Sequence, residues 1–185
     1  MTAHDTLRAA GYRWTTELAL GDDDIDAQGH LNNAAIARAC NDLRIGYVRS
    51  NLGPRWIDWL RSSGSVVVAR EVHLSYDSEG FPGERFVGAT RILRRDGRAA
   101  IIEQQIGEYD TGRTIARAWV VQLLVNAGAV IDWPDFYWPL VESVEERPIP
   151  RLERAPRAAF GPPAWPERAD EPAAPGVTRA WLPRP

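Results

Sequence analysis

Asp24-Ile-Asp-Ala-Gln-Gly-His-Leu-Asn-Asn33 separates a strand-like segment from a long helical one, and this order decides the fold. Residues 12–20, which precede it, are rich in aromatic and β-branched types and therefore favour a strand. Residues 33–50, which follow it, predict a long helix, because apolar side chains recur there at helical spacing. These side chains are Ile36, Cys40, Leu43 and Tyr47, with Ala39 beside them. Asn32 or Asn33 can cap this helix, since an Asx side chain accepts hydrogen bonds from the first free backbone N–H groups.

The pattern changes from helical to alternating after Gly64. Asn51-Leu-Gly-Pro54 is expected to end the long helix, and a short helix is expected over 55–61. Four strands are then predicted in hairpin succession, over 65–76, 85–95, 98–109 and 113–126. In the first of them one face is predicted to carry Val66, Val68, Val72, Leu74 and Tyr76, interrupted by Arg70. Alternating βαβα order is missing, which disfavours a doubly wound parallel sheet. We expect an α+β fold, with a curled antiparallel sheet wrapped around one long central helix.

The C-terminal part of the chain differs in character, because twelve of the 14 prolines lie between Pro134 and Pro185. Proline removes a backbone donor and fixes φ, which disfavours a sheet or a long helix there. We therefore expect a core domain over residues 1–130 and a proline-rich extension over 131–185. Apolar residues suggest that the first part of the extension docks on the domain, whereas the chain from about residue 155 is expected to be extended or partly disordered. The extension is read as a surface wrap, or alternatively as a substrate lid or partner arm.

The composition is that of an ordinary globular protein, with 185 residues, 44% hydrophobic and 25% charged residues. A net charge of −3 argues against a dedicated nucleic-acid binder. The single cysteine, Cys40, excludes an intrachain disulfide, and no apolar run reaches the length of a membrane span. With no recognisable signal peptide, a cytoplasmic protein is expected, with neither nucleic acid nor membrane among its partners.

The densest polar cluster of the chain, residues 21–33, lies between the first strand and the start of the buried helix. The first turn of a helix presents unpaired N–H groups and the positive end of the helix dipole, which polarise a carbonyl oxygen and stabilise an oxyanion. A carboxylate just upstream could face the same carbonyl carbon, and Gly29 permits close backbone approach. Helix caps and solvated charges are the simpler interpretation of such aspartates. An EF-hand is excluded, because Ala27 stands where its glycine is required.

Asp24-x-Asp26-x-x-Gly29-His30-x-Asn32-Asn33 resembles the signature of the 4-hydroxybenzoyl-CoA thioesterase-like branch of the hotdog superfamily. It is also similar to the Asp-x-Asn-x-His-x-Asn-Asn segment of plant acyl-ACP thioesterases. The resemblance in element order covers residues 10–127 and leaves out the proline-rich extension. It implies a hotdog-fold thioesterase that hydrolyses acyl-CoA or acyl-ACP to a free acid and a thiol.

The resemblance also implies roles for the residues of the motif. Asp26 matches the catalytic aspartate, which acts as nucleophile or as general base on water. The backbone N–H near Asn33 matches the donor to the thioester oxygen. His30 matches the histidine of the plant-type motif, where it assists water activation.

Three further residues of the loop are candidates for substrate binding: Gln28, Gly29 and Asn32. Gln28 stands where the plant enzymes have asparagine, so the chain departs from their pattern at that position. No cofactor and no metal site are expected. The resemblance further implies a homodimer or homotetramer with the acyl site between two subunits.

Two other functions compete with hydrolysis. A hotdog hydratase or dehydratase would carry Asp-x-Asn-Pro-x-x-x-His or a His/Glu pair, and the sequence shows neither arrangement. A non-catalytic acyl-CoA-binding protein should lack a well-placed carboxylate, and Asp26 argues against it. Cys40 is interpreted as a small core residue and His73 as structural. The arginines at 91, 94, 95 and 98 are interpreted as a solvated hairpin end, with coenzyme A phosphates as the alternative.

Overall fold

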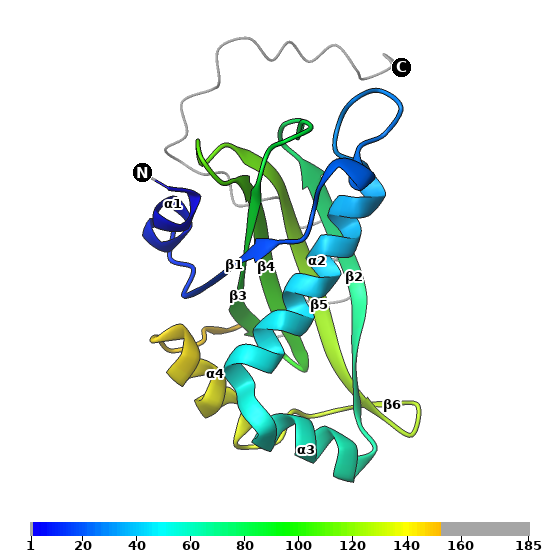
Figure 1. Ribbon diagram of the computed structural model, residues 1–185. Helices are drawn as coiled ribbons and strands as arrows, with labels where there is room; N and C mark the ends of the chain where they lie inside the picture. Colours follow the sequence, from blue (N-terminus) through cyan, green and yellow to red (C-terminus); the bar gives the residue numbers. More distant parts are fainter. Residues whose placement is uncertain (1, 153–185) are drawn as a thin grey trace, which may run out of the picture. The chain divides into compact units, whose positions relative to one another are not determined.

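A long helix lies against one face of a curled sheet in the computed structural model, which describes residues 2–152 (Figure 1). The strands are β1 (Trp14–Leu18), β2 (Val66–Tyr76), β3 (Phe86–Asp96), β4 (Ala99–Glu108), β5 (Thr114–Asn126), β6 (Ala129–Ile131) and β7 (Arg151–Leu152). The helices are α1 (Ala3–Ala9), α2 (Asn33–Tyr47), α3 (Gly53–Ser63) and α4 (Tyr137–Glu145). The main strands follow the spatial order β1-β3-β4-β5-β2 and pair antiparallel throughout. The predicted α+β architecture is therefore confirmed.

Helix α2 buries the side chains that its periodicity predicted. Ile36, Cys40, Leu43 and Tyr47 are each at most 3% exposed. Close packing on the sheet depends on Gly88 of β3, where a methyl group would lie 2.5 Å from Leu43 Cδ2. The helix thus rests directly on β3, and its N-terminal end meets the polar loop.

The end of the long helix differs from the prediction. The chain does not leave the helix at Asn51, because Val48–Leu52 continue it as a π-helical turn into α3. The side-chain amide of Asn51 donates to the carbonyl of Tyr47 over 2.8 Å and so satisfies a helix-end acceptor. Gly53, with φ of +66°, then supplies the change of direction.

The predicted face of β2 is wrong beyond Arg70, because a β-bulge lies between Ala69 and Glu71. The extra residue reverses the alternation, so Val72 pairs with Val120 on the helix side of the sheet. Val66 and Val68 lie on the opposite side of the sheet. Most of the apolar side chains that were predicted to share one face are partly exposed to solvent. Exposed fractions are 54% for Val66, 37% for Val68, 52% for Val72 and 46% for Tyr76. An end strand with this much apolar surface is a surface suited to pairing with another chain.

Residues 3–9 form helix α1, an element that was not predicted from the sequence. Thr2 caps α1 in a reciprocal capping box with Asp5. Leu7, 1% exposed, packs with Val87 and Ala89 of β3. These two positions alternate with Gly88, so α1 covers the face of β3 that α2 leaves free.

Residues that follow β6 dock on the domain as their apolar character predicted. Trp133, Tyr137 and Val141 are buried in the cluster that also holds Tyr47 and Trp56. The division near residue 130 stays a prediction, and the tail expected from residue 155 lies outside the described residues. None of the helices between residues 2 and 152 is long and apolar enough to cross a membrane.

Candidate active site

The polar loop folds into a narrow hairpin that ends at the start of α2. Ile25 and Leu31 form an isolated β-bridge, and the N–H of Asp26 donates to the carbonyl of His30 over 2.8 Å. The N–H of Gly29 donates to the carbonyl of Asp26 over 3.0 Å, and its φ of +85° closes the turn. The loop therefore brings four predicted site residues together in one turn. They are Asp26, Gln28, Gly29 and His30.

The carboxylate of Asp26 is held by the backbone of its own turn. Its Oδ1 accepts from the N–H of Gln28 over 2.8 Å and from the N–H of His30 over 3.3 Å. Both contacts involve Oδ1, so neither uses Oδ2. Within residues 2–152, no side-chain hydrogen bond joins Asp26 to the His30 ring. The carboxylate is thus oriented by two donors while one oxygen is left for other partners.

Asn32 and Asn33 have different positions at the start of α2. Oδ1 of Asn32 caps α2 by accepting from the N–H of Ala34 over 2.7 Å. The N–H of Asn32 donates to the carbonyl of Asp24 over 2.8 Å, which ties the helix start to the hairpin. Asn33 is the first helical residue, so its backbone N–H is one of the groups that an α-helix leaves without an internal acceptor. Helix polarity and this N–H together suit an oxygen that gains negative charge.

The aspartates before the hairpin serve structure, as their interpretation as caps and surface charges predicted. Oδ2 of Asp24 accepts from the N–H of Gly21 over 3.3 Å, and its Oδ1 pairs with Arg38 of α2. Oδ1 of Asp22 accepts from the N–H of Gly83 over 3.3 Å. Both fix the hairpin against neighbouring segments.

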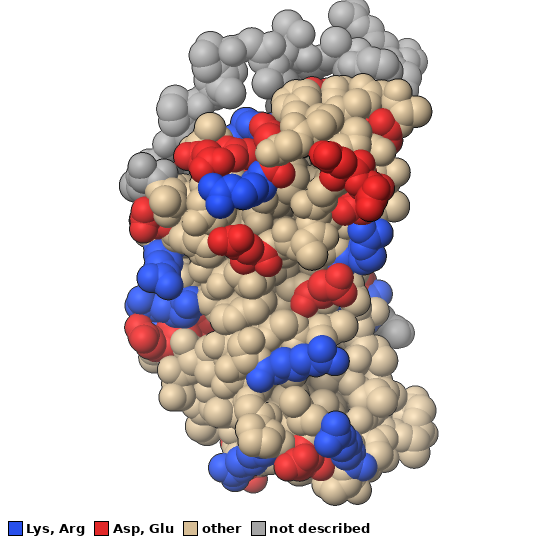
Figure 2. Space-filling model, viewed as in Figure 1, with Lys and Arg blue, Asp and Glu red and all other residues tan. Residues whose placement is uncertain are grey.

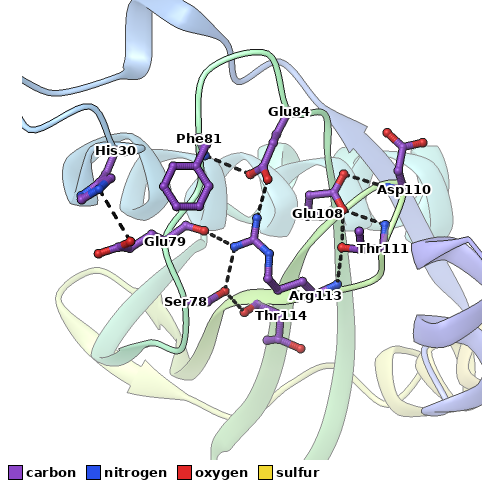
Figure 3. Close-up of polar contacts among 10 residues, drawn as sticks. All are labelled: His30, Ser78, Glu79, Phe81, Glu84, Glu108, Asp110, Thr111, Arg113 and Thr114. Carbon is purple, nitrogen blue, oxygen red and sulfur yellow. Dashed lines mark hydrogen bonds and ion pairs between the residues drawn. The ribbon is translucent and has the colours of Figure 1, made fainter. Parts of the chain in front are cut away.

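A second segment, residues 78–84, passes beside the hairpin, and we call it the strap (Figure 3). The N–H of Leu31 donates to the carbonyl of Gly80 in the strap over 2.8 Å. Nε2 of His30 lies 3.6 Å from Oε2 of Glu79, and the ring meets Phe81 edge-on with centroids 5.6 Å apart. Nothing in the local sequence pattern marks these strap residues, so they were not predicted.

Arg113, the residue just before β5, anchors the strap (Figure 3). Its guanidinium donates to Oε1 of Glu84 over 2.6 Å, to Oγ of Ser78 over 3.2 Å and to the carbonyl of Glu79. Oε2 of Glu84 in turn accepts from the N–H of Phe81 over 2.9 Å. One arginine thus ties down several positions of the strap at once.

The remaining candidates are placed away from this chemistry. Cys40 is buried, and burial raises the pKa of its thiol to about 11, so its interpretation as a core residue is confirmed. His73 pairs with Trp119 in the sheet. Residues 2–152 hold no group of three or more His, Cys, Asp or Glu side chains suited to a metal ion.

Charge is unevenly spread over the face that carries α2. Figure 2 shows most of its acidic side chains in the upper half of the view, the half in which the N-terminal end of that helix lies. Three of the arginines considered for coenzyme A phosphates are already paired. Arg91 pairs with Glu103, Arg94 with Asp96 and Arg98 with Asp132. Their pairing favours the interpretation as an ordinary hairpin surface.

Known proteins resemble this chain in family and in fold. A family model described as the thioesterase-like superfamily matches residues 20–147, which is more than half of the chain. A search of curated proteins finds no match.

Solved structures share the fold at low sequence identity. A thioesterase from Thermus thermophilus, complexed with coenzyme A and Zn, has a TM-score of 0.65 at 19% identity, over 75% of this chain and 98% of that one. A 1,4-dihydroxy-2-naphthoyl-CoA thioesterase from Synechocystis has a TM-score of 0.59 at 14% identity, over 69% and 94%. The 12:0-ACP thioesterase from Umbellularia californica has a TM-score of 0.62 at 12% identity, over 71% and 53%. The expected hotdog fold is confirmed by these likenesses.

Proposed function

The chain belongs to the thioesterase-like superfamily, and on that premise we propose that it hydrolyses an acyl-CoA or acyl-ACP thioester to a free acid and a thiol. One observation carries the proposal: the carboxylate of Asp26 is fixed by two backbone donors in the turn that leads into α2. The carriers are those in the names of the structural relatives, which include coenzyme A and acyl-carrier protein.

The proposed chemistry uses two groups, the backbone N–H of Asn33 and the carboxylate of Asp26. A thioester oxygen near the N–H of Asn33 is polarised by the helix start, and negative charge on that oxygen is stabilised as the carbonyl carbon is attacked. Asp26 acts as a general base when it takes a proton from water whose oxygen bonds to that carbon. As a nucleophile, its own oxygen bonds to the carbon, and water then hydrolyses the anhydride. In both routes the thiolate leaves as the carbonyl is restored.

The other loop residues have supporting roles in the proposal. His30 assists in activating water, while Gln28, Gly29 and Asn32 shape the surface that the acyl carrier approaches. Gly29 holds a positive φ that other residues rarely adopt, so the turn that presents Asp26 depends on it.

A homodimer is part of the proposal, because β2 lies at the end of the strand order with an apolar and partly exposed surface. Tyr76 of β2 donates to the carbonyl of Asn33 over 3.4 Å, so this strand reaches the start of α2. Pairing of two β2 strands would bring a second subunit to the edge of the candidate site.

A panel of acyl-CoA and acyl-ACP substrates tests the function directly through release of free thiol. We expect turnover by the native protein and a loss of more than roughly tenfold for Asp26→Asn, since a positioned acid–base group or nucleophile is removed without change of shape. Asp23→Asn is the matched control, because Asp23 is an exposed aspartate of the same segment, and it should keep native activity. No thiol above background over the whole panel would refute hydrolysis. Binding of coenzyme A without turnover would indicate a binding protein instead.

A further inference from the structure

The ring of His30 contacts two strap residues, Glu79 and Phe81, that are distant from it in the sequence. Glu79 approaches the ring at Nε2, and Phe81 contacts the ring through its edge. The His30 side chain is 34% exposed, so the ring is neither free in solvent nor enclosed in the core. Its orientation therefore depends on where the strap lies.

The strap is placed by contacts that do not involve the Glu79 carboxylate. A methyl group at Gly80 would lie 3.0 Å from Leu31 Cβ and 3.0 Å from Phe86 Cζ, so glycine lets the strap lie close against the hairpin. Oγ of Ser78 donates to the carbonyl of Thr114 over 2.5 Å. The Arg113–Glu84 pair, with side chains 31% and 25% exposed, completes this attachment. Glu79 thus reaches His30 from a backbone that is already fixed.

We propose that Glu79 is a positioning residue for His30 and that Arg113, by anchoring the strap, holds Glu79 in place. The proposal rests on the proposed function, in which His30 takes part in activating water. A carboxylate facing Nε2 favours the tautomer that carries its proton there. That tautomer leaves Nδ1 without a proton, so in the proposal Nδ1 accepts a hydrogen bond from the reacting water while Asp26 takes the other proton of that water.

Stability alone does not account for this arrangement. The Glu79 side chain is 61% exposed, and ion pairs between exposed groups add little to the free energy of unfolding. An orienting role needs only that one tautomer and one ring position be favoured, which a fixed neighbouring carboxylate provides.

The test combines kinetics with ¹⁵N spectra of the histidine rings. Glu79→Gln removes the charge but keeps the shape, and Arg113→Gln releases the strap. Each should lower kcat by about tenfold with KM little changed, less than the ~10²-fold or more expected when an acid–base group itself is lost. Asp110→Asn and Arg85→Gln are the matched controls, since these two residues form an exposed pair at the same end of the domain and should retain native kcat.

The ring spectra separate this proposal from the thioesterase assignment. In the native protein we expect His30 to carry its proton on Nε2, and in Glu79→Gln and Arg113→Gln we expect a mixture of tautomers. His4 and His73 supply internal references whose signals should not move. An unchanged His30 spectrum in Glu79→Gln would overturn the positioning role, even if kcat fell. A changed spectrum with native kcat would overturn its link to catalysis. If native protein shows no turnover, the hydrolysis proposal fails, while the spectra still decide whether Glu79 orients the ring.

Discussion

Replacing Tyr47 by phenylalanine tests the buried contact that holds the far end of α2. The hydroxyl of Tyr47 donates to Oε1 of Glu145 over 2.6 Å, and the N–H of Ile92 donates to the same oxygen over 2.7 Å. Glu145 is 2% exposed, and its Oε2 has no hydrogen-bond partner among the described residues. Loss of the hydroxyl therefore leaves a buried carboxyl group with one donor fewer.

The size of the effect should depend on pH. Burial raises the pKa of Glu145, whereas the hydrogen bond from Tyr47 acts to lower it. With the folded pKa above the unfolded one, the contribution of Glu145 to stability is fully present below the unfolded pKa and is lost as pH rises through the folded pKa. Tyr47→Phe should cost about 1 kcal/mol while the carboxyl is neutral and about 2–3 kcal/mol once it is ionised.

Urea unfolding of the native protein and of Tyr47→Phe at about pH 4 and about pH 8 measures both values. In a Glu145→Leu background the same substitution should cost much less, because the acceptor is gone. A destabilisation that is equal at the two pH values, or that persists unchanged without Glu145, would refute this reasoning.

Two further predictions concern the edge strand and the single thiol. Val72→Lys places a charge on the apolar, half-exposed edge strand β2, so it should lower the mass measured by light scattering to that of a monomer, whereas Val130→Lys on β6 should not. Native protein that is monomeric at micromolar concentration would contradict the dimer. With its pKa raised to about 11 by burial, Cys40 should react with Ellman's reagent at about pH 8 only after unfolding, and fast reaction of the folded protein would contradict this.

The sequence was sufficient to predict those elements in which the spacing of apolar residues follows the buried face. Leu43 and Tyr47 in α2 are buried because one face of the helix meets the core, and the helical spacing of the apolar residues shows that face in the sequence. The bulge at Arg70 escaped prediction, since an inserted residue reverses the alternation without changing its appearance. Helix α1 was missed because it is short and mostly polar, and it depends on the cap at Thr2 and on contacts with β3.

The same distinction separates the parts of the candidate site. Asp26 and Asn32 act within a few residues of themselves, as turn acceptor and helix cap, so a local motif is sufficient to find them. Glu79 contacts His30, and Arg113 contacts the strap, only after β2, β3 and β5 have assembled. Tertiary contacts of this kind leave no periodic or local signal in the chain.

Helix α2 is consequently fixed at both ends by contacts from distant segments. At its C-terminal end Tyr47 is bonded to Glu145 of α4, and near its start Leu31 is bonded to the strap. Because the helix start supplies the N–H groups of the candidate site, a shift of α2 along the sheet would displace those donors from Asp26. Gly88 restricts such a shift by seating Leu43 directly on β3. The motif supplies the groups that are proposed to react, and these distant contacts determine whether the groups face one another.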